Sequence, residues 1–209
     1  MTDSDQAIEI YERNAAALAE QYESLGTGPD FLHLIPPAEP GAIALDIGAG
    51  SGRDAESLVE LGYEVVAAEP AANMRSEGMK RHGLKSIKWL DDRLPSLEAL
   101  RRAGRRFDLI LVSAVWHHVL PDDRPAAFRN IATLMRPGAL LVMTLRHGPA
   151  PEAQPVFPVD VGEVERLALA CGLEMECAVE TEDELERADL GWTSVMLRNP
   201  AMESGKQAD

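Results

Sequence analysis

The sequence predicts an α/β fold built on a doubly wound, mostly parallel sheet of seven strands. From Ala42 onward, short apolar runs alternate with segments of helical periodicity, a pattern typical of parallel strands joined by helices. The last two apolar runs have no helix between them, so we expect them to pair as antiparallel strands and to close one edge of the sheet. Helices should cover both faces of the parallel part.

The predicted elements are bounded by glycine and proline residues. Gly62 and Gly83 end the first two helical segments, and Pro137-Gly138 is expected to turn the chain into the fifth strand. The predicted strands are Ala42–Ile47, Tyr63–Ala68, Ile87–Leu90, Phe107–Ser113, Ala139–Arg146, Glu174–Glu180 and Trp192–Arg198. The predicted helices that join them are Arg53–Leu61, Ala71–His82, Pro95–Ala103, Asp122–Met135 and Asp160–Cys171.

The region before the sheet is predicted to be a helical cover rather than a second domain. Apolar side chains of residues 5–25 fall on one stripe of a helix, and a short helix is expected from Pro29 through Leu34. Prolines then make residues 36–41 a stiff linker. We therefore expect a cover and linker over residues 1–40, a core over residues 41–198 and a flexible tail over residues 199–209.

Composition and charge narrow the class of function. The chain has 209 residues and a formal net charge of −15, which disfavours binding to a nucleic-acid backbone. The arginines at 101, 102, 105 and 106 are interpreted as a solvated helix end. No secretory signal is visible and no apolar stretch approaches the roughly 18–20 residues that span a bilayer. Cys171 and Cys177 lack zinc-ligand spacing. We expect a cytoplasmic protein without a metal or membrane partner, and the oligomeric state stays open.

A glycine-rich loop follows the first predicted strand and indicates a ligand site. In open α/β sheets, ligands bind beyond the carboxyl ends of the strands. Gly48, Gly50 and Gly52 alternate there, two residues after Asp46. Glycines permit unusual dihedral angles and a close approach of the ligand to the main chain. The dinucleotide fingerprint G-x-G-x-x-G would need a glycine where Arg53 stands, which disfavours a nicotinamide cofactor.

An acidic residue closes the second predicted strand. Glu69, followed by Pro70, is placed to accept hydrogen bonds from the ribose hydroxyls of an adenosine-containing ligand. This feature alone does not separate one such ligand from another. The missing third glycine and the antiparallel end of the sheet disfavour a dinucleotide as that ligand.

With these features, the stretch 44–54 resembles motif I of the class I S-adenosylmethionine (SAM)-dependent methyltransferases, in particular the Rossmann-like, bacterial, small-molecule type. The resemblance covers residues from about 42 to 198. It implies that SAM is bound and S-adenosylhomocysteine is released. It also implies that Gly48 and Gly50 contact the amino-acid part of SAM, that Asp46 fixes its ammonium group, and that Glu69 binds the ribose.

The resemblance further implies an acid after the third strand that binds the adenine amino group. Asp91 and Asp92 both match, and we prefer Asp91. Further candidate cofactor contacts are Tyr11, Ala49, Gly52, Pro70, Met74, Ser113 and Trp116. For Met74, Trp116 and Tyr11, ordinary packing in the core is an alternative interpretation.

Candidate residues for the substrate follow the fourth and fifth strands. Histidine titrates near neutral pH and can serve as a general base, and His117 and His118 follow the fourth strand. Two adjacent side chains on an extended backbone cannot both enter one pocket, so one of them is expected to be structural. Arg146 is expected either to bind a substrate carboxylate or phosphate, or to pair with an acid of the protein. The proline-studded loop over residues 149–158 has the length of a lid.

We therefore expect transfer of a methyl group from SAM to an O, N or S nucleophile of a small molecule. Two alternatives remain open. One is a methyltransferase of protein or tRNA, which predicts basic residues around the carboxyl edge of the sheet. The other is a non-catalytic SAM-binding or scaffold protein of the same fold.

Overall fold

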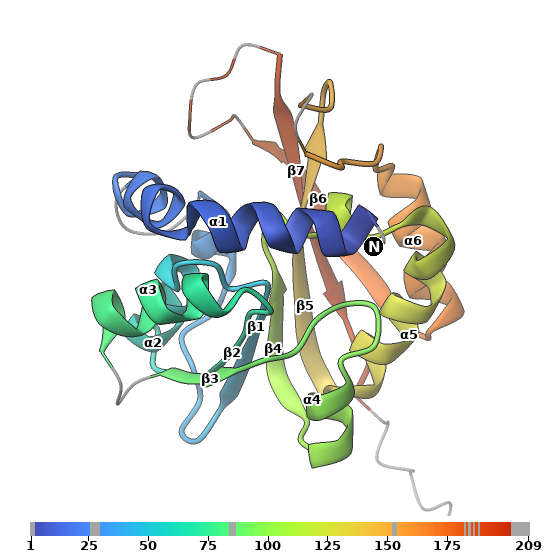
Figure 1. Cartoon of the computed structure of the whole chain (residues 1–209). Helices are drawn as coiled ribbons and strands as arrows, with labels where there is room; N and C mark the ends of the chain where they lie inside the picture. The colour runs from blue at the N-terminus through green and yellow to red at the C-terminus, as the bar shows by residue number, and fades with distance from the viewer. Residues whose placement is uncertain are drawn as a thin grey trace, which may run out of the picture.

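A computed structural model describes residues 3–25, 30–83, 87–151, 154–181, 183, 185, 187 and 189–201 (Figure 1). One sheet of seven strands runs through the molecule, in the order β3-β2-β1-β4-β5-β7-β6. The strands are β1 Ile43–Ile47, β2 Glu64–Ala68, β3 Ile87–Leu90, β4 Phe107–Val112, β5 Met135–His147, β6 Glu174–Thr181 and β7 Gly191–Arg198.

The direction of the strands confirms the predicted fold class. The pairs from β3 across to β5 are parallel. β7 lies between β5 and β6 and is antiparallel to both. The final strand pair is therefore antiparallel, as predicted, and β6 forms one edge of the sheet.

Helices cover both faces of the sheet because successive strand residues point to opposite faces. On one face, α4 Glu98–Ala103, α5 Arg124–Thr133 and α6 Val161–Ala170 contribute to the larger apolar cluster, which includes Phe107 and Phe128. On the other face, α2 Arg53–Glu60 and the short 3₁₀ helix η1 Asp30–Leu34 pack on a second cluster around Leu109 and Leu111. Next to α2 lies α3 Ala72–His82.

The N-terminal helix α1, Asp3–Glu23, forms the predicted helical cover (Figure 1). It crosses the carboxyl ends of the central strands rather than a face of the sheet. Glu23 accepts hydrogen bonds from Ser51 Oγ at 2.7 Å and pairs with His82 Nε2 at 3.0 Å. At the middle of the helix, Glu12 accepts from the amide of Asn73 at 2.9 Å. These contacts attach the cover to the glycine loop and to α3.

Several predicted boundaries are wrong. The fifth strand begins at Met135 rather than Ala139, because Met135 pairs with Phe107 and the register then shifts across Pro137-Gly138. The preceding helix ends at Thr133, and α4 begins at Glu98 rather than Pro95. Two 3₁₀ turns were not predicted, η2 Trp116–His118 and η3 Pro121–Asp123.

The predicted flexible tail is also corrected at its start. Asn199 donates from its backbone to Ala139 O at 2.9 Å and accepts from Gly138 N at 2.7 Å, so the β5–β7 pairing continues past Arg198. The rest of the tail from residue 202 lies outside the described residues, as does Pro29. In the linker, the Tyr63 hydroxyl donates to Pro36 O at 3.0 Å.

Within the described ranges, no helix is long and apolar enough to cross a membrane. The same ranges contain no group of three or more His, Cys, Asp or Glu residues that is arranged to hold a metal ion.

Candidate functional site

A cavity of about 340 Å³ lies at the carboxyl edge of the sheet, beneath α1. The order of the strands fixes the order of its walls. Along the edge, Glu69 follows β2, the glycine loop follows β1, the segment 113–119 follows β4, and Arg146 belongs to the end of β5. Trp192 of β7 closes the row. This position is the one expected for the ligand site of an open α/β sheet.

The glycine loop approaches both the cavity and the segment after β4. Gly48, Ala49 and Gly50 line the cavity. Gly48 has a φ of 74°, and a Cβ on it would lie 2.3 Å from Val115 Cγ2. A left-handed φ and this close contact both require glycine. The loop is therefore fixed by Val115, in the segment after β4, as well as by its own backbone.

Glu69 joins the glycine loop to the start of α3. Its Oε2 accepts a hydrogen bond from Gly50 N at 3.0 Å, and its Oε1 accepts from Ala71 N at 2.8 Å. Burial raises the pKa of Glu69, and the two N–H donors oppose this rise. The carboxylate lines the cavity, and each of its oxygens keeps a further lone pair for a ligand hydroxyl.

Asp46 lies under the glycine loop as a buried acid. It is 1% exposed, and its Oδ2 has no hydrogen-bond partner among the described residues. Burial raises the pKa of Asp46 well above its ordinary value, and the neighbouring carboxylates of Asp54 and Glu69 raise it further. An unpartnered buried carboxylate is costly, and a cationic group placed beside it would recover part of that cost.

Five of the candidate cofactor residues lie outside the cavity lining, namely Asp46, Gly52, Met74, Asp91 and Trp116. Gly52 begins α2 with a φ of 89°, and a Cβ there would lie 2.9 Å from the ring of Trp89, so its role is packing. Met74 is fully buried in a cluster with Ala15 of α1. Trp116 is fully buried and packs edge-on against Phe128. For Met74 and Trp116, the structure supports the core-packing interpretation.

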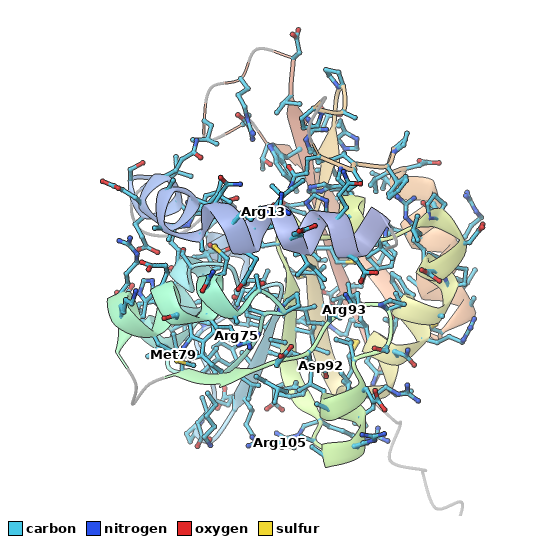
Figure 2. The ribbon with its side chains drawn as sticks, in the orientation of Figure 1. Arg13, Arg75, Met79, Asp92, Arg93 and Arg105 are labelled. Atoms are coloured by element: carbon cyan, nitrogen blue, oxygen red, sulfur yellow. The ribbon has the colours of Figure 1, made fainter. Side chains whose placement is uncertain are left out.

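The order of preference between the two acids after β3 is reversed. The side chain of Asp91 is 71% exposed and pairs with Arg75 at 3.2 Å, away from the cavity. Asp92 is buried and lines the cavity, and it accepts from Leu100 N at 2.9 Å and from Arg93 N at 3.0 Å. In Figure 2, Asp92 and Arg93 lie below α1, on the segment that follows β3.

Both histidines line the cavity, contrary to the expectation that only one would do so. The expectation assumed an extended backbone, whereas His117 and His118 lie on the 3₁₀ turn η2. Their ring centroids are 4.2 Å apart. Burial lowers the pKa of both side chains, most strongly for His117. Both are therefore neutral at neutral pH.

Hydrogen bonds define the tautomer of His118. Its Nδ1 lies 2.9 Å from Pro155 O, which can only accept, so Nδ1 carries the proton. Its Nε2 lies 3.3 Å from the Tyr11 hydroxyl and accepts from it. Tyr11 also lines the cavity, together with the predicted residues Ser113 and Pro70. In contrast, Nδ1 of His117 is buried without a partner among the described residues.

With the described acids of the protein, Arg146 does not form the ion pair that was one of its two predicted roles. The side chain lines the cavity and is 8% exposed. It donates to Pro149 O at 2.7 Å and to Gly148 O at 3.4 Å, and none of the described carboxylates pairs with it. Burial and the nearby Arg187 lower the pKa of Arg146.

Sequence reasoning missed a second group of polar residues between β6 and β7. Asp183 accepts from Arg187 Nη2 at 2.6 Å and from Trp192 Nε1 at 2.8 Å, and all three residues line the cavity. The bond from Arg187 is the main cause that lowers the pKa of Asp183. The run of acids around these residues carries no motif, so only the fold brings them to the site.

The arginine cluster interpreted as a helix end lies away from the cavity. Arg101 and Arg102 end α4, and Arg105 precedes the first residue of β4. Figure 2 shows Arg105 at the end of the molecule opposite α1. The basic residues that the protein or tRNA alternative predicts at the carboxyl edge are therefore not supplied by this cluster.

Comparison with known proteins agrees with this geometry. The sequence profile of the family described as "Methyltransferase domain" matches residues 15–180. The chain belongs to the methyltransferase-domain family. The profile covers the glycine loop, Glu69, both histidines and Arg146 within that family's domain.

Curated relatives of this methyltransferase domain include two bacterial ubiquinone biosynthesis O-methyltransferases. The protein from Methylocella silvestris is 39% identical over 101 residues, which is 48% of this chain and 38% of that protein. The protein from Cereibacter sphaeroides is 37% identical over 110 residues, which is 52% of this chain and 43% of that protein. The aligned part thus spans about two fifths of the length of these relatives.

A solved structure with a similar fold is the 1,6-didemethyltoxoflavin-N1-methyltransferase of Burkholderia thailandensis. The TM-score is 0.73 at 19% identity, and the alignment covers 94% of this chain and 88% of that one. At this level of identity, the likeness establishes the fold of the methyltransferase domain.

Proposed function

We propose that the chain transfers a methyl group from SAM to an O, N or S nucleophile of a small molecule. The observation that carries this proposal is one cavity with two kinds of wall. Glu69 and the glycine loop lie over β2 and β1, whereas two neutral histidines lie over the neighbouring β4. A methyl donor and its acceptor must be held next to each other, as two adjoining walls of one cavity allow.

The residues over β1 and β2 fit a SAM molecule. We define Gly48, Gly50 and Glu69, which line the cavity, together with the buried Asp46 of β1, which does not line it, as the cofactor half. The unpartnered Oδ2 of Asp46 suits an ammonium group, and the two oxygens of Glu69 suit ribose hydroxyls. Asp92, in place of Asp91, is our candidate for the adenine amino group. When bound, SAM supplies an electrophilic methyl group on a sulfonium. The relative from Burkholderia thailandensis is described with bound S-adenosylhomocysteine, which supports this cofactor.

We define His117, His118, Arg146 and Trp192 as the acceptor half of the cavity. Within it, we propose His118 as the general base. Because its Nδ1–H donates to Pro155 O, the basic lone pair lies on Nε2, where the O–H, N–H or S–H group of an acceptor would take the place of the Tyr11 hydroxyl. A fixed tautomer and a neutral ring are what a base needs near neutral pH. His118 takes a proton only from an acceptor that must lose one during the transfer.

A small-molecule acceptor is favoured over protein or tRNA. The ubiquinone biosynthesis relatives are named as O-methyltransferases, and Ala7, Ile8 and Tyr11 of α1 form part of the cavity lining. A cytoplasmic location remains part of the proposal. It is supported by the two free thiols, Cys171 and Cys177, since reducing compartments keep thiols free.

Calorimetry and product detection test this function together. We expect the protein to bind SAM and S-adenosylhomocysteine at micromolar concentrations, and to form S-adenosylhomocysteine when a suitable small acceptor is added. Binding of neither compound at tens of micromolar would remove the proposal. Binding without product from any acceptor class would instead support the non-catalytic alternative.

A further inference from the structure

Arg146 is a buried cation whose charge the described protein groups do not neutralise. It is 8% exposed, and among the described residues its hydrogen bonds go to the carbonyl oxygens of Gly148 and Pro149. Carbonyl groups satisfy N–H donors but carry no net charge. Taking an unpaired ion out of water is unfavourable, and a counter-ion in the cavity would offset that cost.

The neighbouring charges increase this imbalance. Arg187 faces the same cavity, and the only described carboxylate close to both guanidinium groups is Asp183. Both oxygens of Asp183 are already engaged, because Arg187 binds them at 2.6 and 2.9 Å and Trp192 Nε1 donates to one of them at 2.8 Å. The described groups in this corner thus provide two guanidinium charges and one carboxylate charge.

The histidines do not alter this balance. Burial lowers the pKa of both His117 and His118, so neither adds a positive charge at neutral pH. However, they bring a polar group that still lacks a partner, since Nδ1 of His117 is buried and unbonded among the described residues. A ligand in this corner therefore meets one surplus positive charge and an unsatisfied ring nitrogen.

The sheet brings these groups to one place. Arg146 and Trp192 are directly opposite each other in the β5–β7 pair, so their side chains leave the same face of the sheet. The Trp192 ring approaches His117 edge-on, with a centroid distance of 5.9 Å. The cation, an aromatic wall and the histidines proposed for methyl transfer thus share one corner of the cavity.

We infer that the methyl acceptor is a small organic anion whose carboxylate or phosphate group binds to Arg146. A guanidinium group pairs with either anion through two parallel N–H donors. The acceptor would then extend past Trp192 toward the histidines. This inference rests on the proposed function and assigns Arg146 as the residue that selects charged acceptors.

Binding of simple probe anions tests the inference without knowledge of the natural acceptor. The full-length protein, saturated with S-adenosylhomocysteine, is titrated with benzoate, phenyl phosphate and benzamide. The indole N–H resonance of Trp192, whose ring lines the cavity, reports binding. We expect benzoate or phenyl phosphate to bind at least about 10-fold more tightly than neutral benzamide, as a charge-assisted pair requires. The tighter of the two anions identifies the charged group.

Variants on the same strand separate this site from general charge effects. Arg146→Gln should abolish the preference for anions. Arg136→Gln should retain it, because Arg136 lies at the other end of β5 and pairs there with Asp108. If Arg146→Gln does not fold, Arg146→Lys should weaken benzoate binding about 3- to 10-fold and leave benzamide binding unchanged, because lysine lacks the planar pair of donors.

Two results would overturn the inference. One is equal affinity of the wild-type protein for the anions and benzamide, and the other is an anion preference that survives in Arg146→Gln or is unchanged in Arg146→Lys. S-adenosylhomocysteine binding is measured first in every sample. If the wild-type protein does not bind it, the proposed function fails, whereas binding without an anion preference contradicts only the present inference.

Discussion

The two halves of the cavity differ in how their polar groups are held. In the cofactor half, backbone amides of the glycine loop and of α3 donate to the carboxylate of Glu69. In the acceptor half, the polar groups are side chains. Some bond one another, as in the Tyr11–His118 and Trp192–Asp183 pairs, and His118 and Arg146 also donate to carbonyl groups of the loop after β5. The first half is acidic and fixed by the main chain, whereas the second is neutral to cationic and formed by side chains from separate elements. A backbone-built half suits one invariable ligand, and a side-chain-built half suits acceptors that vary.

The contact between Gly48 and Val115 is where the halves meet, and we expect Gly48→Ala to have the largest effect. The left-handed φ costs about 1–2 kcal/mol for a residue with a Cβ, and overpacking against Val115 adds about 1–3 kcal/mol. Thermal unfolding should show a clear loss of stability, and calorimetry should show loss of S-adenosylhomocysteine binding.

Gly104→Ala is the control for this variant. Gly104 has a left-handed backbone with a φ of 64°, but a Cβ there would meet nothing within 4 Å. It should therefore cost only the backbone strain and leave cofactor binding intact. Equal losses in the two variants would mean that the Val115 contact does not join the halves.

His118→Gln should separate transfer from cofactor binding. For an acceptor that must lose a proton, removal of a general base typically slows transfer by about 100- to 10,000-fold. Affinity for S-adenosylhomocysteine should stay within about twofold. Single-turnover formation of S-adenosylhomocysteine gives the rate, and His147→Gln is the control because His147 bonds Thr193 outside the cavity lining. A similar slowing in both variants would contradict the role of His118.

The pH dependence of cofactor binding should report Asp46. Its raised pKa means that the ligand-free protein holds a proton there at low pH. A cationic ammonium group favours the carboxylate, so affinity for S-adenosylhomocysteine should rise with pH until Asp46 ionises. Calorimetry over a pH series should show this rise in the wild-type protein and a flatter profile in Asp46→Asn.

The raised pKa of Asp46 also predicts how the stability of the ligand-free protein depends on pH. Since the pKa of Asp46 is higher in the folded than in the unfolded state, its stabilising contribution is complete below the unfolded value and is lost as pH rises through the folded value. At neutral pH, Asp46→Asn should therefore raise the free energy of unfolding of the ligand-free protein, because it removes the cost of burying the charge. Denaturant titration would measure it, and a loss of stability would contradict burial of an unpaired charge.

Tyr11→Phe should have the smallest effect. The Tyr11 hydroxyl donates to Nε2 of His118 and so favours the neutral ring. Removal of this hydroxyl should raise the pKa of His118. The acid limb of the pH–rate profile should then move to higher pH, with little change in cofactor affinity. An unchanged acid limb would show that the 3.3 Å contact does not influence the base.

The cofactor half was the more predictable part of the site. A strand, alternate glycines and an acid at the end of the next strand are local patterns, and they place Gly48, Gly50 and Glu69 at the cavity. The acceptor half depends on contacts between distant segments. The bond of His118 to Pro155 joins residues 37 positions apart in the chain, and no local pattern indicates it.

Errors in the prediction have the same origin. Both histidines reach the cavity because η2 turns the backbone, a short 3₁₀ element that hydrophobic periodicity does not reveal. Asp91 and Asp92 are adjacent, and only the position of α4, whose Leu100 amide binds Asp92, determines which acid is buried. The strands and the closing antiparallel pair were predictable from apolar runs and the connections between them, whereas the insertion of β7 between β5 and β6 was not predicted.

The most direct measurement is the affinity of S-adenosylhomocysteine for Glu69→Gln and Glu64→Gln, determined by calorimetry. Both residues are on or next to β2, Glu64 exposed at its start and Glu69 buried just beyond its end. We expect Glu69→Gln to weaken binding about 10- to 100-fold, the loss expected for charge-assisted hydrogen bonds, and Glu64→Gln to bind like the wild-type protein. Equal affinity in all three proteins would contradict the placement of the cofactor half.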